Sequence, residues 1–274
     1  MALLFAVAMN AFVYWKSDTL ALKANGAREL RPGELPGLRS IVADLARRAG
    51  LPMPRVYVVD RPEPNAFATG RDPEHAAVAV TTGILEVMDE RQLRGVLAHE
   101  VSHVKNRDTL VGTIAATIGG AISFLAQMAQ FQMIFGGGRD DENGGGGLGA
   151  LIAIILAPIA ALVIQLAVSR GREYGADRSG AALTGDPEGL AQALLNLDAA
   201  AKRQTGILGR MAGRMPGRRG QAPAPAPAAN PAFAHLYIVN PLSGRAIGGL
   251  FSTHPPIEER VARLRSMGRG RLAA

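Results

Sequence analysis

Two histidines, His99 and His103, stand four residues apart and enclose Glu100 in the pattern His-Glu-x-x-His. On an α-helix each residue turns about 100°, so side chains four apart point within about 40° of one another and both imidazoles can reach one ion. Neutral imidazole is a common zinc ligand, and a zinc ion with three protein ligands keeps a further position for a water molecule whose pKa falls to about 7. Glu100 lies about 100° round the helix from His99, where it could take a proton from that water and pass it to a leaving amine. The pattern therefore predicts half of a hydrolytic zinc site.

The element that must position these residues is a helix over 89–107. Its apolar residues recur at the three- and four-residue spacing of a helix with one buried face: Leu93, Val96, Leu97, Val101 and Val104. Asp89 followed by Gln92 resembles a capping box at the start of this helix. The competing interpretation is a chance match on an amphipathic helix, with histidines that are exposed or act as caps.

The composition narrows the choice of ligands and partners. The chain has 274 residues, enough for one good core or two small ones, and contains no cysteine, so histidine and carboxylate are its strong metal ligands. The formal charge of +7 could indicate nucleic-acid binding, but the basic residues lie beside apolar runs and in one linker. Four Tyr, eight Phe and one Trp are too few for a base-stacking platform, so we expect no nucleic-acid partner.

Two uncharged stretches after the motif, 109–135 and 148–168, are each long enough to span a bilayer, and loop 136–147 between them is rich in glycine. Two buried helices of a soluble domain are the alternative. The basic residues near both ends of this hairpin predict that both ends lie in the cytoplasm: Lys105, Arg107, Arg170 and Arg172. Two crossings return the chain to the side it left, so a residue just past 168 could meet the helix of His99.

The N-terminal residues 1–15 are apolar apart from Asn10. As a helix they would cover about 22 Å, which is short of the hydrocarbon core of about 30 Å. This length favours a membrane segment that lacks its start, with an interfacial anchor as an alternative. A cleaved signal peptide is the third interpretation, although the stretch has neither a basic beginning nor a convincing cleavage site.

Carboxylates that could complete the metal site follow the second apolar run. Glu173 and Asp177 are four residues apart, which places them on one helical face. Such a pair could supply the third zinc ligand and a carboxylate that orients a ligand imidazole. By spacing alone, a surface arrangement with arginine neighbours is the stronger interpretation.

Other patterns predict the surrounding elements. We expect an amphipathic helix from Leu35 that stops at Gly50, strands at 55–60 and 76–82, and a helix that begins with Asp186-Pro187-Glu188. Between the strands, Asn65 to Gly70 is typical of a turn and short edge strand, to which an extended peptide could pair.

His254 stands before two prolines that present it rigidly, which suits a donor to a developing oxyanion. A single histidine at a helix start is, however, more often a cap or a solvent-exposed group. A helix with Ile257, Val261 and Leu264 on one side follows it and ends at Gly268.

Four segments together resemble the HtpX heat-shock membrane proteases, which belong to the wider metallopeptidase group that includes the CAAX-prenyl processing proteases. The segments are Asn65-Ala66-Phe67-Ala68, His99-Glu100-Val101-Ser102-His103, Arg172-Glu173-Tyr174-Gly175-Ala176-Asp177 and Ser252-Thr253-His254-Pro255-Pro256. The resemblance extends from about Phe5 to Leu264, and this combination in this order is far more specific than His-Glu-x-x-His alone.

The resemblance implies a role for each matching residue. His99, His103 and Glu173 would be zinc ligands, and Glu100 would be the general base and acid. Asp177 and Arg260 would support the site, and His254, with help from Arg260, would stabilise the tetrahedral intermediate. The substrate cleft would be lined by Asn65, Ala66, Phe67 and Ala68.

The fold implied is α+β: a zincin-like, mainly helical metalloprotease domain with a small sheet, interrupted by a transmembrane helical hairpin. Its parts would be an N-terminal membrane segment (1–15), the first part of the zincin domain (16–108), the hairpin (109–168), the second part with the third ligand (169–201), a basic Ala/Pro-rich linker (202–230) and the C-terminal part (231–274). Family members commonly carry two N-terminal apolar segments, whereas one short segment stands here.

The activity implied is that of a zinc metalloendopeptidase with one Zn²⁺ per chain. It would be a multi-pass protein of the bacterial inner membrane that faces the cytoplasm and cleaves misfolded membrane proteins in quality control and stress response. Expected partners are polypeptide or membrane-protein substrates, the lipid bilayer and other quality-control proteases. The alternatives are a zinc hydrolase of non-peptide amides and a membrane scaffold or assembly factor with a structural zinc site.

Overall fold

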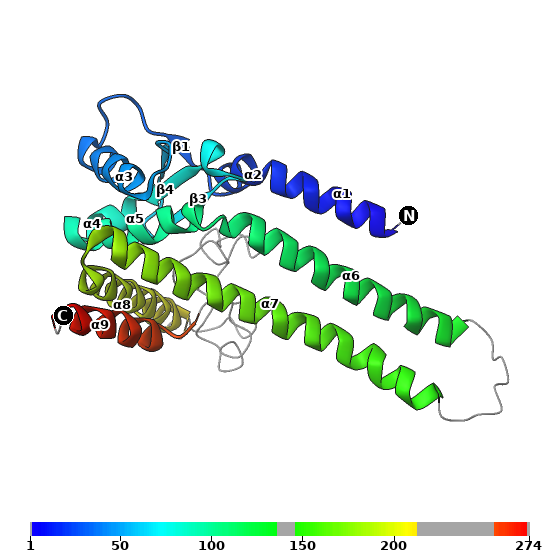
Figure 1. Cartoon of the computed structure of the whole chain (residues 1–274). Helices are drawn as coiled ribbons and strands as arrows, with labels where there is room; N and C mark the ends of the chain where they lie inside the picture. The colour runs from blue at the N-terminus through cyan, green and yellow to red at the C-terminus, as the bar shows by residue number, and fades with distance from the viewer. Residues whose placement is uncertain (1, 136–145, 213–254, 273–274) are drawn as a thin grey trace.

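The computed structural model describes residues 2–135, 146–212 and 255–272 (Figure 1). A head built from a small sheet and several helices carries a long helical hairpin that projects from it (Figure 1). The elements in chain order are α1 (Ala2–Trp15), α2 (Ser17–Ala24), β1 (Arg28–Glu29), α3 (Pro36–Ala49), β2 (Arg55–Val59), β3 (Ala66–Thr69), the 3-10 turn η1 (Pro73–His75), β4 (Ala77–Thr81), α4 (Thr82–Val87), α5 (Glu90–Lys105), α6 (Asp108–Phe135), α7 (Gly146–Thr184), α8 (Pro187–Ala212) and α9 (Ile257–Leu272).

The sheet has four strands in the order β1-β2-β4-β3, with β2 and β4 parallel and the other pairs antiparallel. Successive side chains of a strand point to opposite faces. Val56 and Val58 therefore enter the main core with α3, α5 and α8, while Tyr57 and Val59 enter a smaller core with α2. Both strands predicted from their β-branched residues are confirmed, and β3 forms an edge of the sheet, as predicted for Asn65 to Ala68.

Helix α5 lies at the centre of the head and confirms the predicted helix around the histidines. The side chain of Asp89 accepts a hydrogen bond of 2.8 Å from the backbone N–H of Gln92, which forms one half of the predicted capping box. Leu97 and Val101 are fully buried in the main core. The helix is therefore held on most of its circumference, which fixes the direction of its functional side chains.

Glycines let α7 and α8 approach the backbone of α5. A Cβ atom at Gly180 of α7 would lie 2.9 Å from the backbone nitrogen of His99, and one at Gly95 of α5 would lie 2.8 Å from that of Leu190 in α8. Real Cβ atoms do not approach so closely, so these positions require glycine. The close contact at Gly180 brings the carboxylates of α7 to the histidines of α5.

The hairpin consists of α6 and the first part of α7, which run side by side away from the head (Figure 1). Within the described residues, Asp108–Phe131 is the one helix that meets the length and hydropathy expected of a membrane span, and only 6% of its apolar window is buried. Helix α7 continues without a break past Pro158 to Glu173 and Asp177. The predicted span 148–168 lies within this helix, although the side chains of residues 148–153 and 155 are outside the described ones.

Several local features differ from the sequence-based expectations. Helix α9, expected to end at Gly268, continues to Leu272. Residues 146 and 147, expected in the loop, belong to α7, and Ser17–Ala24 forms a helix that was not predicted. Helix α8 continues to Ala212, so residues 202–212, expected to be part of the basic Ala/Pro-rich linker, are helical. This stretch is rich in Lys, Arg, Gln, Leu and Met, which favour a helix over a disordered linker. The rest of the predicted linker lies outside the described residues.

Candidate metal centre

The two histidines of α5 meet a carboxylate of α7. The Nε2 atoms of His99 and His103 are 3.1 Å apart, and Glu173 oxygens lie 3.5 Å from the first and 3.7 Å from the second. Ligand atoms round a tetrahedral zinc ion with bonds of about 2.0–2.1 Å lie about 3.4 Å from one another. The spacing and the donor types of this cluster therefore fit a zinc ion.

A carboxylate holds the far nitrogen of each imidazole. His99 Nδ1 lies 3.0 Å from Asp177 Oδ1, and His103 Nδ1 lies 2.5 Å from Asp108 Oδ2. A hydrogen bond at Nδ1 places the ring proton there, which leaves Nε2 with its lone pair directed into the cluster. Both histidines are thus oriented as metal ligands.

Arg260 of α9 joins Asp177 and Glu173 in a buried charge network. Its Nε and Nη2 atoms donate to the two oxygens of Asp177 at 2.9 and 2.7 Å, and its Nη1 lies 3.4 Å from Glu173 Oε2. Arg260 is 0% exposed, and a charge at such a depth is tolerated only when it is paired. Burial by itself raises the pKa of Asp177, but Arg260 and His99 hold it well below its usual range.

The cluster favours a positive charge at its centre. Burial by itself lowers the pKa of His99, yet the hydrogen bonds that its ring donates to Asp177 and Glu173 outweigh burial and raise it to about 10. The carboxylates therefore stabilise an added charge on the imidazole in the metal-free protein. A divalent cation satisfies the same need, which is a second sign that the residues fit zinc.

Glu100 lies next to the cluster and is 5% exposed. Burial raises its pKa, which His99 and His103 oppose, and one of its oxygens accepts a 2.8 Å hydrogen bond from the backbone N–H of Ala68 on β3. A buried carboxylate with a raised pKa is suited to proton transfer near neutral pH. The arrangement can hold a cation, a water molecule and a base within one buried site.

Comparison with known proteins identifies the family. The model of Peptidase family M48 matches residues 33–268. The chain belongs to peptidase family M48.

The M48 relatives include proteins named protease HtpX homologue. Those of Persephonella marina, Desulfatibacillum aliphaticivorans and Aquifex aeolicus are 52%, 52% and 49% identical to this chain, over 98%, 96% and 98% of its length and 87%, 79% and 83% of their own. The crystal structure of S. mikatae Ste24p matches 96% of this chain and 57% of its own length with a TM-score of 0.58 and 18% identity, which shows a shared fold.

These findings confirm the expectations about family, activity, metal and fold. The resemblance to HtpX proteases is confirmed, and this M48 protein is a membrane-bound zinc metalloprotease. The α+β fold with a mainly helical metalloprotease domain and a small sheet is confirmed as well.

The residues expected to line the substrate cleft of this M48 protein differ in where their side chains lie. Ala66 and Phe67 are buried in the two cores on opposite faces of the sheet, and Asn65 is buried at the start of the strand. Ala68 is half-buried and faces Glu100 through its backbone. What β3 presents toward the site is therefore its backbone edge more than its side chains.

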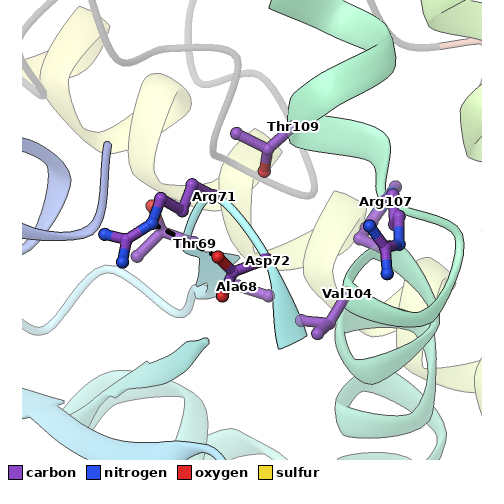
Figure 2. Close-up of a pocket in the computed structure, with 9 residues that line it drawn as sticks. Ala68, Thr69, Arg71, Asp72, Val104, Arg107 and Thr109 are labelled. Carbon is purple, nitrogen blue, oxygen red and sulfur yellow. Dashed lines mark ion pairs between the residues drawn. The ribbon is translucent and has the colours of Figure 1, made fainter. Parts of the chain in front are cut away.

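A cavity of about 20 Å³ adjoins His103 (Figure 2). Its walls come from β3 and the turn after it, from the end of α5 and from the start of α6: Ala68, Thr69, Gly70, Arg71, Asp72, His103, Val104, Arg107 and Thr109. Arg71 and Asp72 pair at 3.2 Å on one side, and Arg107 stands across from them on the α5 side (Figure 2). The cavity places charged groups beside the candidate metal centre, at the junction with the hairpin.

One predicted residue is not placed, and one important residue was missed. His254 lies outside the described residues. Asp108 was not predicted, although it stands five residues after His103 as the acid that precedes the apolar run. That position was the available signal, because a carboxylate so close to a ligand histidine is a candidate partner for its second nitrogen.

Proposed function

We propose that His99, His103 and Glu173 hold the zinc ion of a membrane-bound endopeptidase, with Glu100 as its general base and acid. The observation that carries the proposal is the convergence of the three donor groups, whose ligand atoms all lie within 4.8 Å of one another, beside a buried carboxylate. When bound, the zinc ion would polarise a water molecule and the scissile carbonyl.

The protein's own residues would handle the proton. A Glu100 oxygen would accept a proton from the attacking water and deliver it to the nitrogen of the leaving amine, so the carboxylate would end the cycle as it began. Its burial supports this role, because a raised pKa lets the group hold the proton between the two transfers. Asp177 and Asp108 would keep the imidazole rings in place throughout.

Substrate would bind in an extended form along the outer edge of β3. An edge strand offers unpaired backbone groups to which a peptide can add as a further strand. The N–H of Ala68 is at this edge and lies 2.8 Å from Glu100, so a peptide paired here would lie beside the base. Ala68 would act through its outward-facing backbone, whereas Asn65, whose N–H and C=O both bond Thr81, would hold the start of the strand. His254 would donate to the oxyanion.

The site would face the cytoplasm of a bacterium from the inner membrane, with the catalytic domain interrupted by the hairpin. Large apolar side chains on the outside of α6 and α7 support a lipid-facing surface: Ile114, Ile118, Leu125, Phe131, Leu156, Ile159, Val163 and Ile164. The basic residues near the two ends support a cytoplasmic location of both. We further propose misfolded membrane proteins as substrates and other quality-control proteases as partners, as in the HtpX family.

The test compares two glutamates of α5 in the full-length protein. Glu100→Gln should keep zinc and lose cleavage of an unfolded protein substrate, whereas Glu90→Gln, at an exposed position of the same helix, should keep both. Glu173→Ala should lose the metal. Zinc binding at wild-type strength in Glu173→Ala would refute the ligand assignment. Unchanged cleavage by Glu100→Gln would refute the base, and turnover of small amides without cleavage of protein would favour the amide hydrolase.

A further inference from the structure

Two residues at the base of the hairpin, Asp108 and Arg172, form a contact chain that ends on a candidate metal ligand. Asp108 is the first residue of α6 and is 7% exposed, and its Oδ2 lies 2.5 Å from His103 Nδ1. Its backbone carbonyl accepts a 2.7 Å hydrogen bond from Nη1 of Arg172 on α7. The side chain of Arg172 therefore connects the start of one hairpin helix to the other at the level of the metal centre.

The packing around this contact is specific. The guanidinium of Arg172 lies against Gly112, one turn into α6, and a Cβ atom at that position would collide with its Nη1. Arg172 also directly precedes Glu173 in the unbroken helix α7. The contact thus sets the register of α6 against α7 beside both Asp108 and Glu173.

The backbone before Asp108 makes this register necessary. Arg107 has a φ of 55°, in the left-handed region that non-glycine residues rarely occupy, and it separates α5 from α6. His103 and Asp108 consequently belong to different helices, and the distance between them depends on how α6 is placed. A contact that fixes α6 also fixes the carboxylate on the imidazole.

We propose that Asp108 is a positioning residue for the zinc ligand His103 and that Arg172 holds it there by clamping the base of the hairpin. Asp108 keeps the proton of His103 on Nδ1 and the lone pair of Nε2 on the metal side. Arg172 acts through Asp108 and does not touch the metal. This inference rests on the proposed function, because it takes His103 as a ligand.

The test measures the zinc dissociation constant of the full-length protein in detergent by competition with a chelator of known affinity. Asp108→Ala should weaken zinc binding about 10- to 100-fold. Asp108→Asn, which keeps an oxygen acceptor without the charge, should recover part of this loss. Asp89→Ala is the matched control, because it removes an acid from the start of α5 without contact to a ligand, and it should bind zinc as the wild type does.

A double-mutant cycle tests the clamp. Arg172→Ala should weaken zinc binding less than Asp108→Ala does, and it should add no further loss in the Asp108→Ala background. Arg178→Ala, at an exposed position of the same helix, should have no effect. Additive losses would mean that Arg172 acts on zinc by another route and would overturn the clamp.

Two results would overturn the role of Asp108. One is wild-type zinc affinity in Asp108→Ala, and the other is an equal loss in Asp108→Ala and Asp89→Ala, which would indicate a general loss of helix stability. His99→Ala reports separately on the proposed function. Retained zinc affinity in that variant would refute the ligand assignment, whatever the result at Asp108.

Discussion

The two imidazoles of the metal centre are supported in different ways. His99 is 1% exposed and is held by Asp177, which in turn is paired twice with the buried Arg260. The side chain of His103 is 21% exposed and is held by Asp108, at the point where the hairpin leaves the head. One candidate ligand is thus backed by a charge network inside the head and the other by the first residue of a hairpin helix.

The two supports connect different helices, so disturbing them should have different effects. The network of His99, Asp177 and Arg260 ties α5, α7 and α9 together, so disturbing it affects the fold as well as the metal. The support of His103 ties α5 to α6, so disturbing it affects the metal and the position of the hairpin. Four predictions test how far the two sides differ.

The largest effect is expected on the His99 side from Arg260→Ala. The substitution leaves Asp177 buried without its main positive partner, and breaking a buried pair in this way costs about 3–5 kcal/mol. Denaturant unfolding of the metal-free protein measures the loss. Arg263→Ala, an exposed arginine of the same helix, should cost much less, and similar losses in both variants would contradict the prediction.

Removal of zinc should affect the His103 side more than the His99 side. At free zinc a hundredfold above its dissociation constant, binding stabilises the native state by about 2.7 kcal/mol, and chelation removes this amount. Without zinc, His99 keeps the charge network, while the support of His103 depends on the placement of α6. Hydrogen exchange before and after chelation should therefore change more over 103–108 than over 97–100. Equal changes in hydrogen exchange over the two segments would contradict the prediction.

Gly180→Ala should disturb the close contact of α7 with α5 behind His99. The added Cβ would lie 2.9 Å from the His99 nitrogen, and such overpacking typically costs about 1–3 kcal/mol. Gly171→Ala is the matched control in the same helix, because its Cβ would meet nothing within 4 Å, and it should stabilise the protein by about 0.5–1 kcal/mol. Thermal unfolding of the two variants should thus shift in opposite directions.

Asp89→Ala should have the smallest effect and should not distinguish the two sides. It removes the cap of the helix that carries both histidines, at a cost of about 1 kcal/mol. Because the substitution is remote from both ligands, zinc titration should give the wild-type affinity. Zinc binding that is lost at only one of the two histidines, detected by nuclear magnetic resonance of the imidazole rings, would contradict this expectation.

Local patterns in the sequence predicted most of the head. Helix α5 and strands β2 and β4 follow from the residue types and periodicity of neighbouring residues. The end of α3 follows from Gly50, which takes a φ of 70°. The carboxylate pair Glu173 and Asp177 was found by its spacing, but spacing alone favoured a surface location. Its burial depends on glycine contacts between helices that are distant in the chain.

Features that depend on a change in the direction of the chain between helices could not be predicted from local sequence patterns. Asp108 contacts His103 because Arg107 takes a left-handed conformation that separates two helices, and no periodicity spans such a break. The depth of Arg260 depends on the packing of α9 against α8 and α7, and the amphipathic pattern of α9 did not show which of its arginines is buried. The segment Ser17–Ala24, half of whose residues are polar, packs Ala21 and Leu22 of its helix into the smaller core of the sheet.

The continuity of α7 has a consequence for assays of this protein in lipid. A hydrophobic helix tilts to match the thickness of the lipid around it, and a stiff rod passes such a tilt along its whole length. The rod here ends beyond Glu173 and Asp177. We therefore expect the rate of cleavage to depend on bilayer thickness, which assays should hold constant as they do temperature.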